Sequence, residues 1–210
     1  MEKKLSKREW NKTQKRAALL EAAEKLFLQK GFDNTSIEDV ASTAKLTKRT
    51  LYQYFLSKED LYFAVALKGA RMLFNAFNEG LNQGATAMEK IRLANKVHLQ
   101  FYRENIGLFR ILNYKPSNRE NSAASPSFRE LATLDGVRMQ SYMRLVEEGR
   151  ADGSINPGID TRKAVFFAVF SAFSLLYTVA MTDKDIWTAL EMDENDFLGF
   201  SFDMIADALK

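Results

Sequence analysis

The stretch that decides the fold is residues 35–58, which read TSIEDVASTAKLTKRTLYQYFLSK. Apolar residues recur in it every three or four positions on both sides of a three-residue turn, Lys45-Leu46-Thr47. This spacing predicts two short helices joined by a tight turn, which together make a helix-turn-helix. Val40 on the first helix and Leu51 on the second are placed to form its small core.

The start of the second helix carries groups that can bind DNA. The run Thr47-Lys48-Arg49-Thr50 places two cations and two hydroxyls at one helix end, with Thr47 as the expected cap. Such an end can enter the major groove, where Arg49 can form two hydrogen bonds to a guanine and Lys48 can bind a base or a phosphate. Upstream, Thr35-Ser-Ile-Glu38 has the spacing of a capping box, and the hydroxyls of Thr35 and Ser36 can donate to a phosphate.

Positive charge gathers at the start of the chain, whose 210 residues carry a net charge of +3. Residues 1–60 hold 13 Lys or Arg against 9 Asp or Glu, whereas residues 61–210 hold 17 against 18. Residues 1–60, called the head below, are thus basic, and the rest of the chain, called the body, is nearly neutral. This distribution is typical of a chain whose N-terminus binds a polyanion. The arm from Lys3 to Arg16 can add phosphate or minor-groove contacts, and it is equally compatible with an extension of the first helix or a loose tail.

Helical periodicity continues along the rest of the chain, and no run alternates polar and apolar residues as a strand does. This predicts an all-α fold of about nine helices, with a loop over residues 115–126, where prolines, serines and asparagines gather. Gly31 is expected to end the first helix, and Ser127 and Asp160 to cap two later ones. The expected helices cover about residues 8–30, 35–44, 47–55, 57–81, 86–104, 106–113, 127–151, 160–181 and 194–209.

One segment of the body, Ala164–Met181, has 18 residues without a charge and reaches the length of a membrane span. Its helical spacing favours a different interpretation, because Phe166, Phe170, Phe173 and Tyr177 fall on one side and small residues fall on the other. A helix that is apolar nearly all round suits burial between two partners, so we expect no membrane association. The charged residues from Met1 to Arg16 are not followed closely by an apolar stretch, so we expect no secretory signal and a cytoplasmic protein.

The composition argues against catalysis and metal binding. The chain has no cysteine and a single histidine, His98, which excludes cysteine nucleophiles and thiolate sites and disfavours a histidine zinc site. The carboxylates are scattered, and no set resembles an acid–base pair. We therefore expect no enzyme, no cofactor and no metal, although a helical enzyme stays an alternative.

Several short runs in the head resemble the N-terminal signature of the TetR/AcrR-type transcriptional regulators. The resemblance extends from about Ala17 to Leu67, and the body matches that family only in helix count, length and the turn that starts at Glu148-Gly149. The runs that carry the resemblance are Gly31-Phe32, Thr35-Ser36, Asp39-Val40-Ala41, Thr50-Leu51-Tyr52, Tyr54-Phe55 and Ser57-Lys58-Glu59.

The resemblance implies a homodimeric repressor that binds a near-palindromic, double-stranded operator and is released by a small-molecule inducer. Residues 1–56 would be the helix-turn-helix DNA-binding domain, and residues 57–210 the ligand-sensing and dimerisation domain. The last two helices would pair with those of a second copy. Activation in place of repression stays open, and so does a DNA-binding regulator or helical adaptor that has no small ligand.

Eleven residues fall where the resemblance implies DNA contacts. Two of them depart from the usual family pattern: Lys45 stands where glycine is common and the backbone is often left-handed, and Arg49 replaces a small residue. Singly, each of these residues also suits an ordinary surface or core position. The DNA-contact residues are Thr35, Ser36, Lys45, Thr47, Lys48, Arg49, Thr50, Tyr52, Gln53, Tyr54 and Lys58.

The body is rich in aromatic residues and methionine, which suits an apolar ligand cavity between helices as well as a plain core. The inducer is therefore expected to be largely apolar. For His98, a hydrogen-bonded structural role is the alternative to a ligand contact. The candidate cavity residues are Phe74, Phe77, His98, Phe101, Tyr102, Phe109, Leu112, Met139, Tyr142, Phe166 and Phe170.

Overall fold

A computed structural model describes residues 6–81, 83–114 and 124–210. Within these residues the chain forms ten helices and no strand, which confirms the all-α prediction. The tenth helix is the short α9 (Lys184–Ala189), which was not expected and whose N-cap residue, Asp183, forms no side-chain capping bond. Most of the expected loop at 115–126 lies outside the described residues.

The contacts divide the chain into two compact units. The first comprises the described residues up to Gly69 together with those of Tyr114–Ala132, and the second comprises those of Ala70–Asn113 and Thr133–Lys210. Helices α4 (Lys58–Leu81) and α7 (Pro126–Asp152) begin in the first unit and continue into the second. The first unit thus extends further along α4 than the head expected at residues 1–56.

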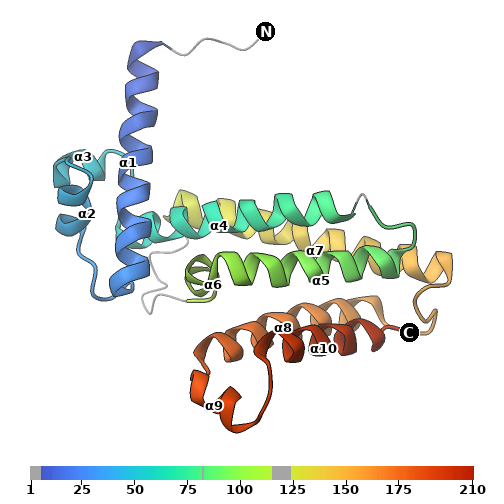
Figure 1. The fold of residues 1–210 in the computed structure, drawn as a ribbon. Coiled ribbons are helices and arrows are strands. Elements are labelled where there is room, and N and C mark those ends of the chain that lie inside the picture. Colours follow the sequence, from blue (N-terminus) through green and yellow to red (C-terminus); the bar gives the residue numbers. More distant parts are fainter. Residues whose placement is uncertain (1–5, 82, 115–123) are drawn as a thin grey trace. The chain divides into compact units, whose positions relative to one another are not determined.

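The first unit contains the predicted helix-turn-helix. Helix α1 (Lys7–Lys30) packs along α2 (Ile37–Thr43), and α2 packs on α3 (Lys48–Tyr52), as Figure 1 shows. Val40 and Leu51 are buried together with Leu19 and Phe55, so the small core forms as the spacing predicted. Gly31 ends α1 with a φ of 77°, a conformation that glycine adopts without strain.

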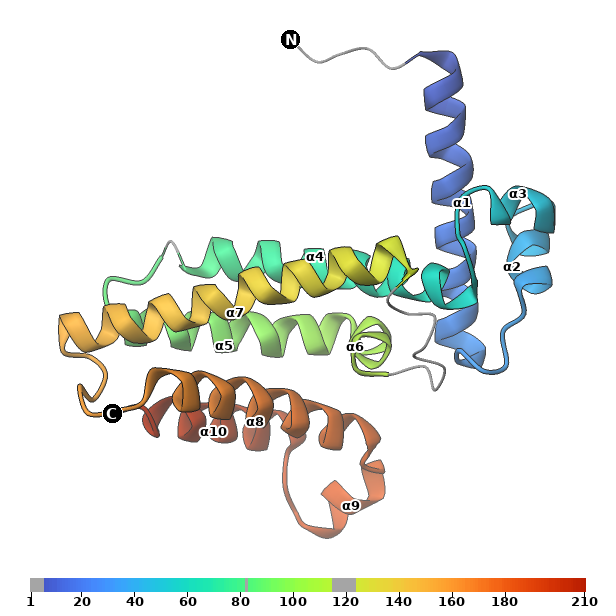
Figure 2. The ribbon, with the colours of Figure 1, turned by 180° about the vertical axis from the view of Figure 1, so that it is seen from behind.

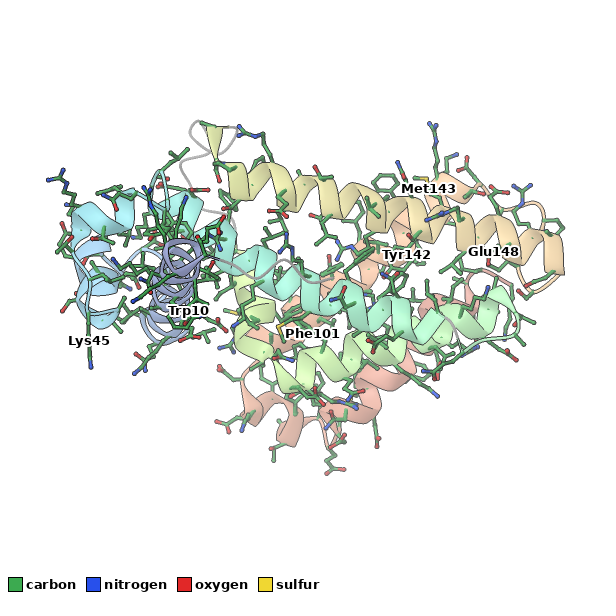
Figure 3. All side chains as sticks on the ribbon, turned by 90° about the horizontal axis from the view of Figure 1, so that it is seen from above. Trp10, Lys45, Phe101, Tyr142, Met143 and Glu148 are labelled. Carbon is green, nitrogen blue, oxygen red and sulfur yellow. The ribbon has the colours of Figure 1, made fainter. Side chains whose placement is uncertain are left out.

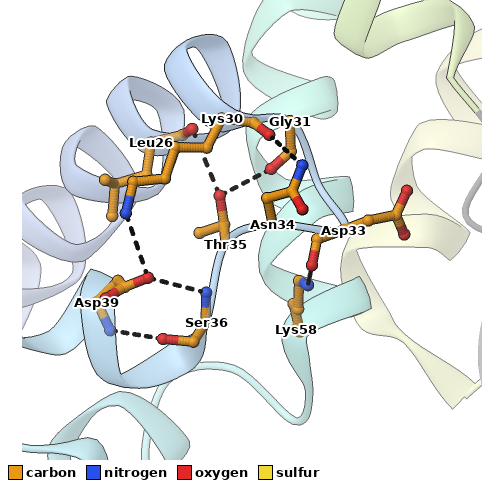
Figure 4. A network of polar contacts seen from close by, with 9 residues as sticks. All are labelled: Leu26, Lys30, Gly31, Asp33, Asn34, Thr35, Ser36, Asp39 and Lys58. Atoms are coloured by element: carbon orange, nitrogen blue, oxygen red, sulfur yellow. Dashed lines mark hydrogen bonds and ion pairs between the residues drawn. The ribbon is translucent and has the colours of Figure 1, made fainter.

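The predicted capping box at Thr35 is wrong by one residue. Ser36 caps α2 by accepting from the N–H of Asp39 (3.0 Å), and Asp39 accepts from the N–H of Ser36 in return (3.3 Å). Thr35 is 2% exposed, and its hydroxyl donates to the carbonyl oxygen of Gly31 at 2.8 Å (Figure 4). A second contact, 3.4 Å to the carbonyl of Leu26, places Thr35 firmly between α1 and α2.

A buried carboxylate joins the starts of α4 and α7 inside the first unit. Asp60 accepts from the hydroxyl of Ser125 (2.6 Å), the N–H of Ser127 (3.2 Å) and the N–H of Leu56 (3.0 Å). Burial opposes its ionisation, but these hydrogen bonds outweigh burial and lower the pKa of Asp60. Ser125, and not the predicted Ser127, accepts from the N–H of Phe128 (3.0 Å), because Pro126 already occupies the first helical position.

The second unit contains the other helices: α5 (Ala87–Glu104), α6 (Ile106–Asn113), α8 (Thr161–Met181), α9 and α10 (Glu194–Asp207). Figures 1 and 2 show α8 and α10 side by side, and both α8 and α5 contact α10. Thr86 with Glu89 caps α5 and Asp160 caps α8, as predicted. A Cβ at Gly149 would lie 2.5 Å from the Cδ1 of Ile155, so this glycine lets the turn after α7 fold back onto the helix.

Helix α8 has two unlike faces. Ala164 and Val165 are buried, whereas Phe167 and Phe170 are 52% and 61% exposed. Among the described residues, α8 is the one helix long and apolar enough to span a membrane, and 28% of its most apolar stretch is buried within the chain. Most of the apolar surface of α8 therefore has no partner among the residues that the structure describes.

Candidate nucleic-acid interface and ligand cavity

The N-terminus of α3 presents polar groups to solvent. Thr47 caps the helix by accepting from the N–H of Thr50 (3.1 Å), and the two hydroxyl oxygens lie 2.9 Å apart. Arg49 is exposed and forms no ion pair with any described residue. Its guanidinium is therefore available for the planar, two-bond recognition of a base edge that arginine performs well.

Lys48, the neighbour of Arg49, is already paired. Its ammonium donates to the carboxylate of Glu38 on α2. This hydrogen bond raises the pKa of Lys48 and lowers that of Glu38. Both side chains are about half exposed, so the pair contributes little stability and can exchange for a phosphate at small cost.

The start of α2 is less suited to phosphate than the sequence suggested. The N–H of Ser36 donates to Asp39, which also forms an ion pair with Lys30 at 3.5 Å (Figure 4). Hydrogen bonds from Ser36 lower the pKa of Asp39, so this end of α2 carries a carboxylate. Thr35 is enclosed, and only Ser36 of the two expected hydroxyls lies at the surface.

The turn between α2 and α3 has the backbone that the family pattern implied. Lys45 has a φ of 56°, which is rare for a residue with a side chain. The N–H groups of Lys45 and Leu46 donate to the carbonyls of Ser42 (3.0 Å) and Ala41 (2.9 Å), and these bonds tie the turn to the end of α2. Figure 3 shows the Lys45 side chain pointing away from the head helices.

The candidate residues from the end of α3 onward divide into exposed and anchored ones. Tyr52 is 47% exposed and Gln53 is also exposed, whereas Tyr54 is half-buried. The ammonium of Lys58 lies 4.3 Å from the ring centroid of Phe32 and donates to the carbonyl of Asp33 at 3.3 Å (Figure 4). Lys58 therefore stabilises the packing of α4 on the loop after α1. These contacts limit how far its ammonium can extend toward DNA.

A small cavity of about 40 Å³ lies in the second unit among α5, α7, α8 and α10. Its polar lining consists of Asn95, His98 and Tyr142, and no charged residue is among its walls. Small residues of α8 provide the space, since Ala164, Ala168 and Ala172 recur at intervals of four. The apolar lining is Ile91, Val146, Ala164, Val165, Ala168, Val169, Ala172, Phe173, Ile205, Ala206 and Leu209.

His98 and Tyr142 form the polar pair of this cavity. The Tyr142 hydroxyl and the Nε2 atom of His98 are 3.2 Å apart. Burial, and next the nearby charge of Arg138, lower the pKa of His98 to about 4. Burial also raises the pKa of Tyr142 well above its usual value, so both groups are neutral at pH 7.

Only two of the expected cavity residues, His98 and Tyr142, line the cavity. Phe77 lies behind them, with its ring centroid 4.9 Å from that of Tyr142. Phe166 and Phe170 differ most from expectation: they are exposed and stack on each other at 5.6 Å, because α8 turns its small residues inward and these two rings outward. Phe173, expected on the same aromatic side, instead lines the cavity, with its ring centroid 6.0 Å from that of His98.

The other expected cavity residues are packed elsewhere in the second unit. The buried rings of Tyr102 and Phe109 contact each other edge to face at 5.4 Å, and Met139 packs against the buried core. Phe101 is also buried, and Phe74 and Leu112 are half-buried. Half of the lining residues that we did not predict lie on α8, and the sequence signal for them was the small-residue face with Ala164, Ala168 and Ala172.

Comparisons with known proteins agree with this architecture. Residues 19–65 match the family described as bacterial regulatory proteins, tetR family. The chain is 23% identical over 149 residues to the HTH-type transcriptional repressor KstR2 of Mycolicibacterium smegmatis, covering 70% of each chain. It is 25% identical over 150 residues to the fatty acid metabolism regulator protein of Bacillus subtilis, covering 70% of this chain and 73% of the relative.

A solved structure gives the same fold over nearly the whole chain. The transcriptional regulator FadR from Bacillus subtilis, in complex with stearoyl-CoA, superimposes with a TM-score of 0.69 and 19% identity. The match covers 92% of this chain and 96% of that one.

Replacing Lys45 with glycine is expected to raise the free energy of unfolding by about 1 kcal/mol, because glycine adopts the left-handed backbone without steric cost. Urea unfolding measures the change. The matched control is Lys25→Gly inside α1, where the same replacement should lower stability by about 1 kcal/mol. Equal losses at both positions would show that the left-handed turn is not the source of strain.

Acidification from pH 7.5 to 5.5 is expected to lower the free energy of unfolding by about 1.4 kcal/mol. The pKa of His98 is near 4 in the folded protein and 6.5 when unperturbed, so the unfolded chain binds a proton in this window and the folded chain does not. His98 is the only histidine, so His98→Gln should flatten the dependence. Parallel pH profiles for the two proteins in urea unfolding would contradict a buried, neutral His98.

Proposed function

Because the chain is a TetR-type transcriptional regulator, we propose that it binds a near-palindromic operator as a homodimer and represses transcription until a small, largely apolar inducer releases it. It would act in the cytoplasm, where the DNA is. The observation that carries the proposal is the N-terminus of α3, where an unpaired Arg49 stands beside Lys48 on a capped, exposed helix end. A dimer presenting two such ends about 34–36 Å apart would read two half-sites one helical turn apart.

The outer face of the last two long helices supports dimerisation. Phe166, Phe167, Phe170 and Tyr177 on α8 are exposed, and so are Phe200 and Met204 on α10. Exposed apolar side chains gathered on two helices that pack together are typical of an interaction surface. We propose that α8 and α10 pair with the same helices of a second copy, which would bury the apolar surface that gives α8 its membrane-like composition.

The cavity of the second unit is the observation in favour of an inducer site. Its volume of about 40 Å³ is far below the ~300 Å³ at which drug-sized ligands fit, so an inducer must separate helices to enter. The ligand would thus bind a conformation that differs from the closed one described here, as a releasing ligand has to. Helix α4 runs on from the head into the second unit, which gives a continuous element for a coupling of roughly 1–3 kcal/mol.

The walls of the cavity favour an uncharged inducer. Burying an isolated carboxylate among apolar groups is costly unless a cation or several donors compensate it. Here the polar groups are Asn95 and the neutral pair of His98 and Tyr142, while Arg138 forms an ion pair with Asp135 at 3.0 Å. Among relatives, the B. subtilis FadR complex contains stearoyl-CoA, a charged thioester, so the ligand of this chain need not be the same.

Selection from a randomised duplex pool tests the DNA-binding proposal. The native protein should enrich a near-palindrome, and Arg49→Ala should relax the preference at the guanine that Arg49 contacts by about 1–3 kcal/mol per half-site. Lys96→Ala, an exposed cation of the second unit, is the control and should enrich the native sequence. Salt-sensitive binding without enrichment would mean that the head binds DNA only through charge.

Thermal shift with 1-decanol and decanoate tests the inducer class. Decanol should raise the melting temperature and weaken operator binding more than decanoate does, because the polar groups of the cavity are neutral. Ala168→Val fills part of the cavity and should abolish the decanol effect, whereas Ala132→Val on an exposed part of α7 should not. A larger decanoate effect would contradict the neutral site, and no effect of either would favour the regulator without a ligand.

A further inference from the structure

The first three turns of α1 continue beyond the core of the head. Every residue from Ser6 to Arg16 is exposed, whereas burial begins after this point, with Leu19 the first fully enclosed side chain. Figures 1 and 2 both show this part of α1 standing clear of α2 and α3. At 1.5 Å per residue, Lys7–Arg16 extends the helix by about 15 Å.

One face of α1 carries apolar side chains where the helix packs on the core and cations where it extends beyond the core. Arg8, Lys12, Lys15, Leu19, Ala22 and Leu26 follow each other at intervals of four, three, four, three and four, which places them on one helix face. The last three are buried against the head. The face that buries apolar side chains in one half of α1 therefore presents cations in the other half.

Local contacts hold the exposed half helical. Ser6 accepts from the N–H of Glu9 (3.2 Å), and Glu9 accepts from the N–H of Ser6 (2.9 Å), which completes a capping box. At the other end, the Arg16 guanidinium lies 5.1 Å from the ring centroid of Phe55, which is buried. Glu9 is the one carboxylate in the described part of this extension, and the cap engages it.

The cationic face of α1 forms an open groove with the residues at the end of α3. The groove has a volume of about 720 Å³. Four cations line it, none of them ion-paired with a described residue, and no carboxylate is among its walls. Gln53, which caps the C-terminus of α3, and Tyr54 form the opposite wall. The complete lining is Lys7, Arg8, Asn11, Lys12, Lys15, Gln53 and Tyr54.

We propose that this groove binds the phosphate backbone of the same DNA duplex whose bases α3 reads, so that each protomer holds the operator by α1 as well as by the helix-turn-helix. The inference rests on the proposed function. Its basis is the shared wall: a duplex against α3 brings its phosphates next to Gln53 and Tyr54, and the cations face them across the groove. Such contacts release counterions and add affinity without adding base preference.

The experiment compares the salt dependence of operator binding for two triple variants. Lys7→Gln/Lys12→Gln/Lys15→Gln removes three groove cations, and Lys96→Gln/Lys163→Gln/Lys184→Gln removes three exposed lysines of the second unit. Each contact contributes about 0.9 to the slope of log K against log salt, so the groove variant should lose about 5 from the slope of a dimer. The control should keep the native slope, and both variants should select the native operator sequence.

Three outcomes separate this inference from the proposed function. A shallower slope with the operator preference retained supports the groove as a phosphate site. Equal slopes for the groove variant and the native protein would overturn the groove while leaving operator reading intact. If the native protein enriches no operator, the proposed function fails first, and circular dichroism shows whether each variant retains its helices.

Discussion

Every helix of this protein has to bury its apolar stripe, and the rest of the structure depends on where that burial is possible within one chain. In the head, the stripe of α1 meets α2 and the start of α4 as far back as Leu19, and before that point it turns cationic. In α8 the small-residue face meets α5 and α10, while Phe166, Phe170 and Tyr177 on the other side remain exposed. Two of the surfaces we assign to function, the groove beside α1 and the outer face of α8, therefore lie where an apolar stripe is replaced or left without a partner.

Local signals in the sequence predicted most of the fold. Spacing and caps placed α2, α5, α6 and α8 within a residue or two, since a cap is a contact between residues three positions apart. The start of α3 was also predicted, but the helix ends at Tyr52, three residues before the expected Phe55. The left-handed backbone at Lys45 followed from the resemblance and is confirmed. The error at Thr35 has a local cause as well: Thr35 and Ser36 both stand three residues before an acid, and only their packing decides that Thr35 is buried and Ser36 caps α2.

Contacts between distant residues account for what the sequence did not reveal. The pairing of Lys48 with Glu38 joins two helices, and the burial of Lys58 against Phe32 spans 26 positions, so neither follows from periodicity. The cavity lining is of the same kind, because a stripe of alanines becomes a cavity only when His98 and Tyr142 face it from other helices. Aromatic residues were expected there, but rings fill space, and the open volume lies beside the smallest side chains of α8.

The small size of the cavity also limits how tightly the proposed inducer could bind and which helix it would move. For the proposed inducer, a closed site of about 40 Å³ would make the ligand-competent conformation a minor one, and the apparent affinity would fall by the fraction of molecules that adopt it. The same helix, α8, forms one wall of the cavity and carries the exposed aromatic face, so opening the wall moves residues that we assign to the dimer interface. Dimerisation and ligand binding would therefore act on one element. Any substitution that loosens α8 against α5 should strengthen ligand binding and weaken the pairing of protomers together, because both depend on the position of a single helix.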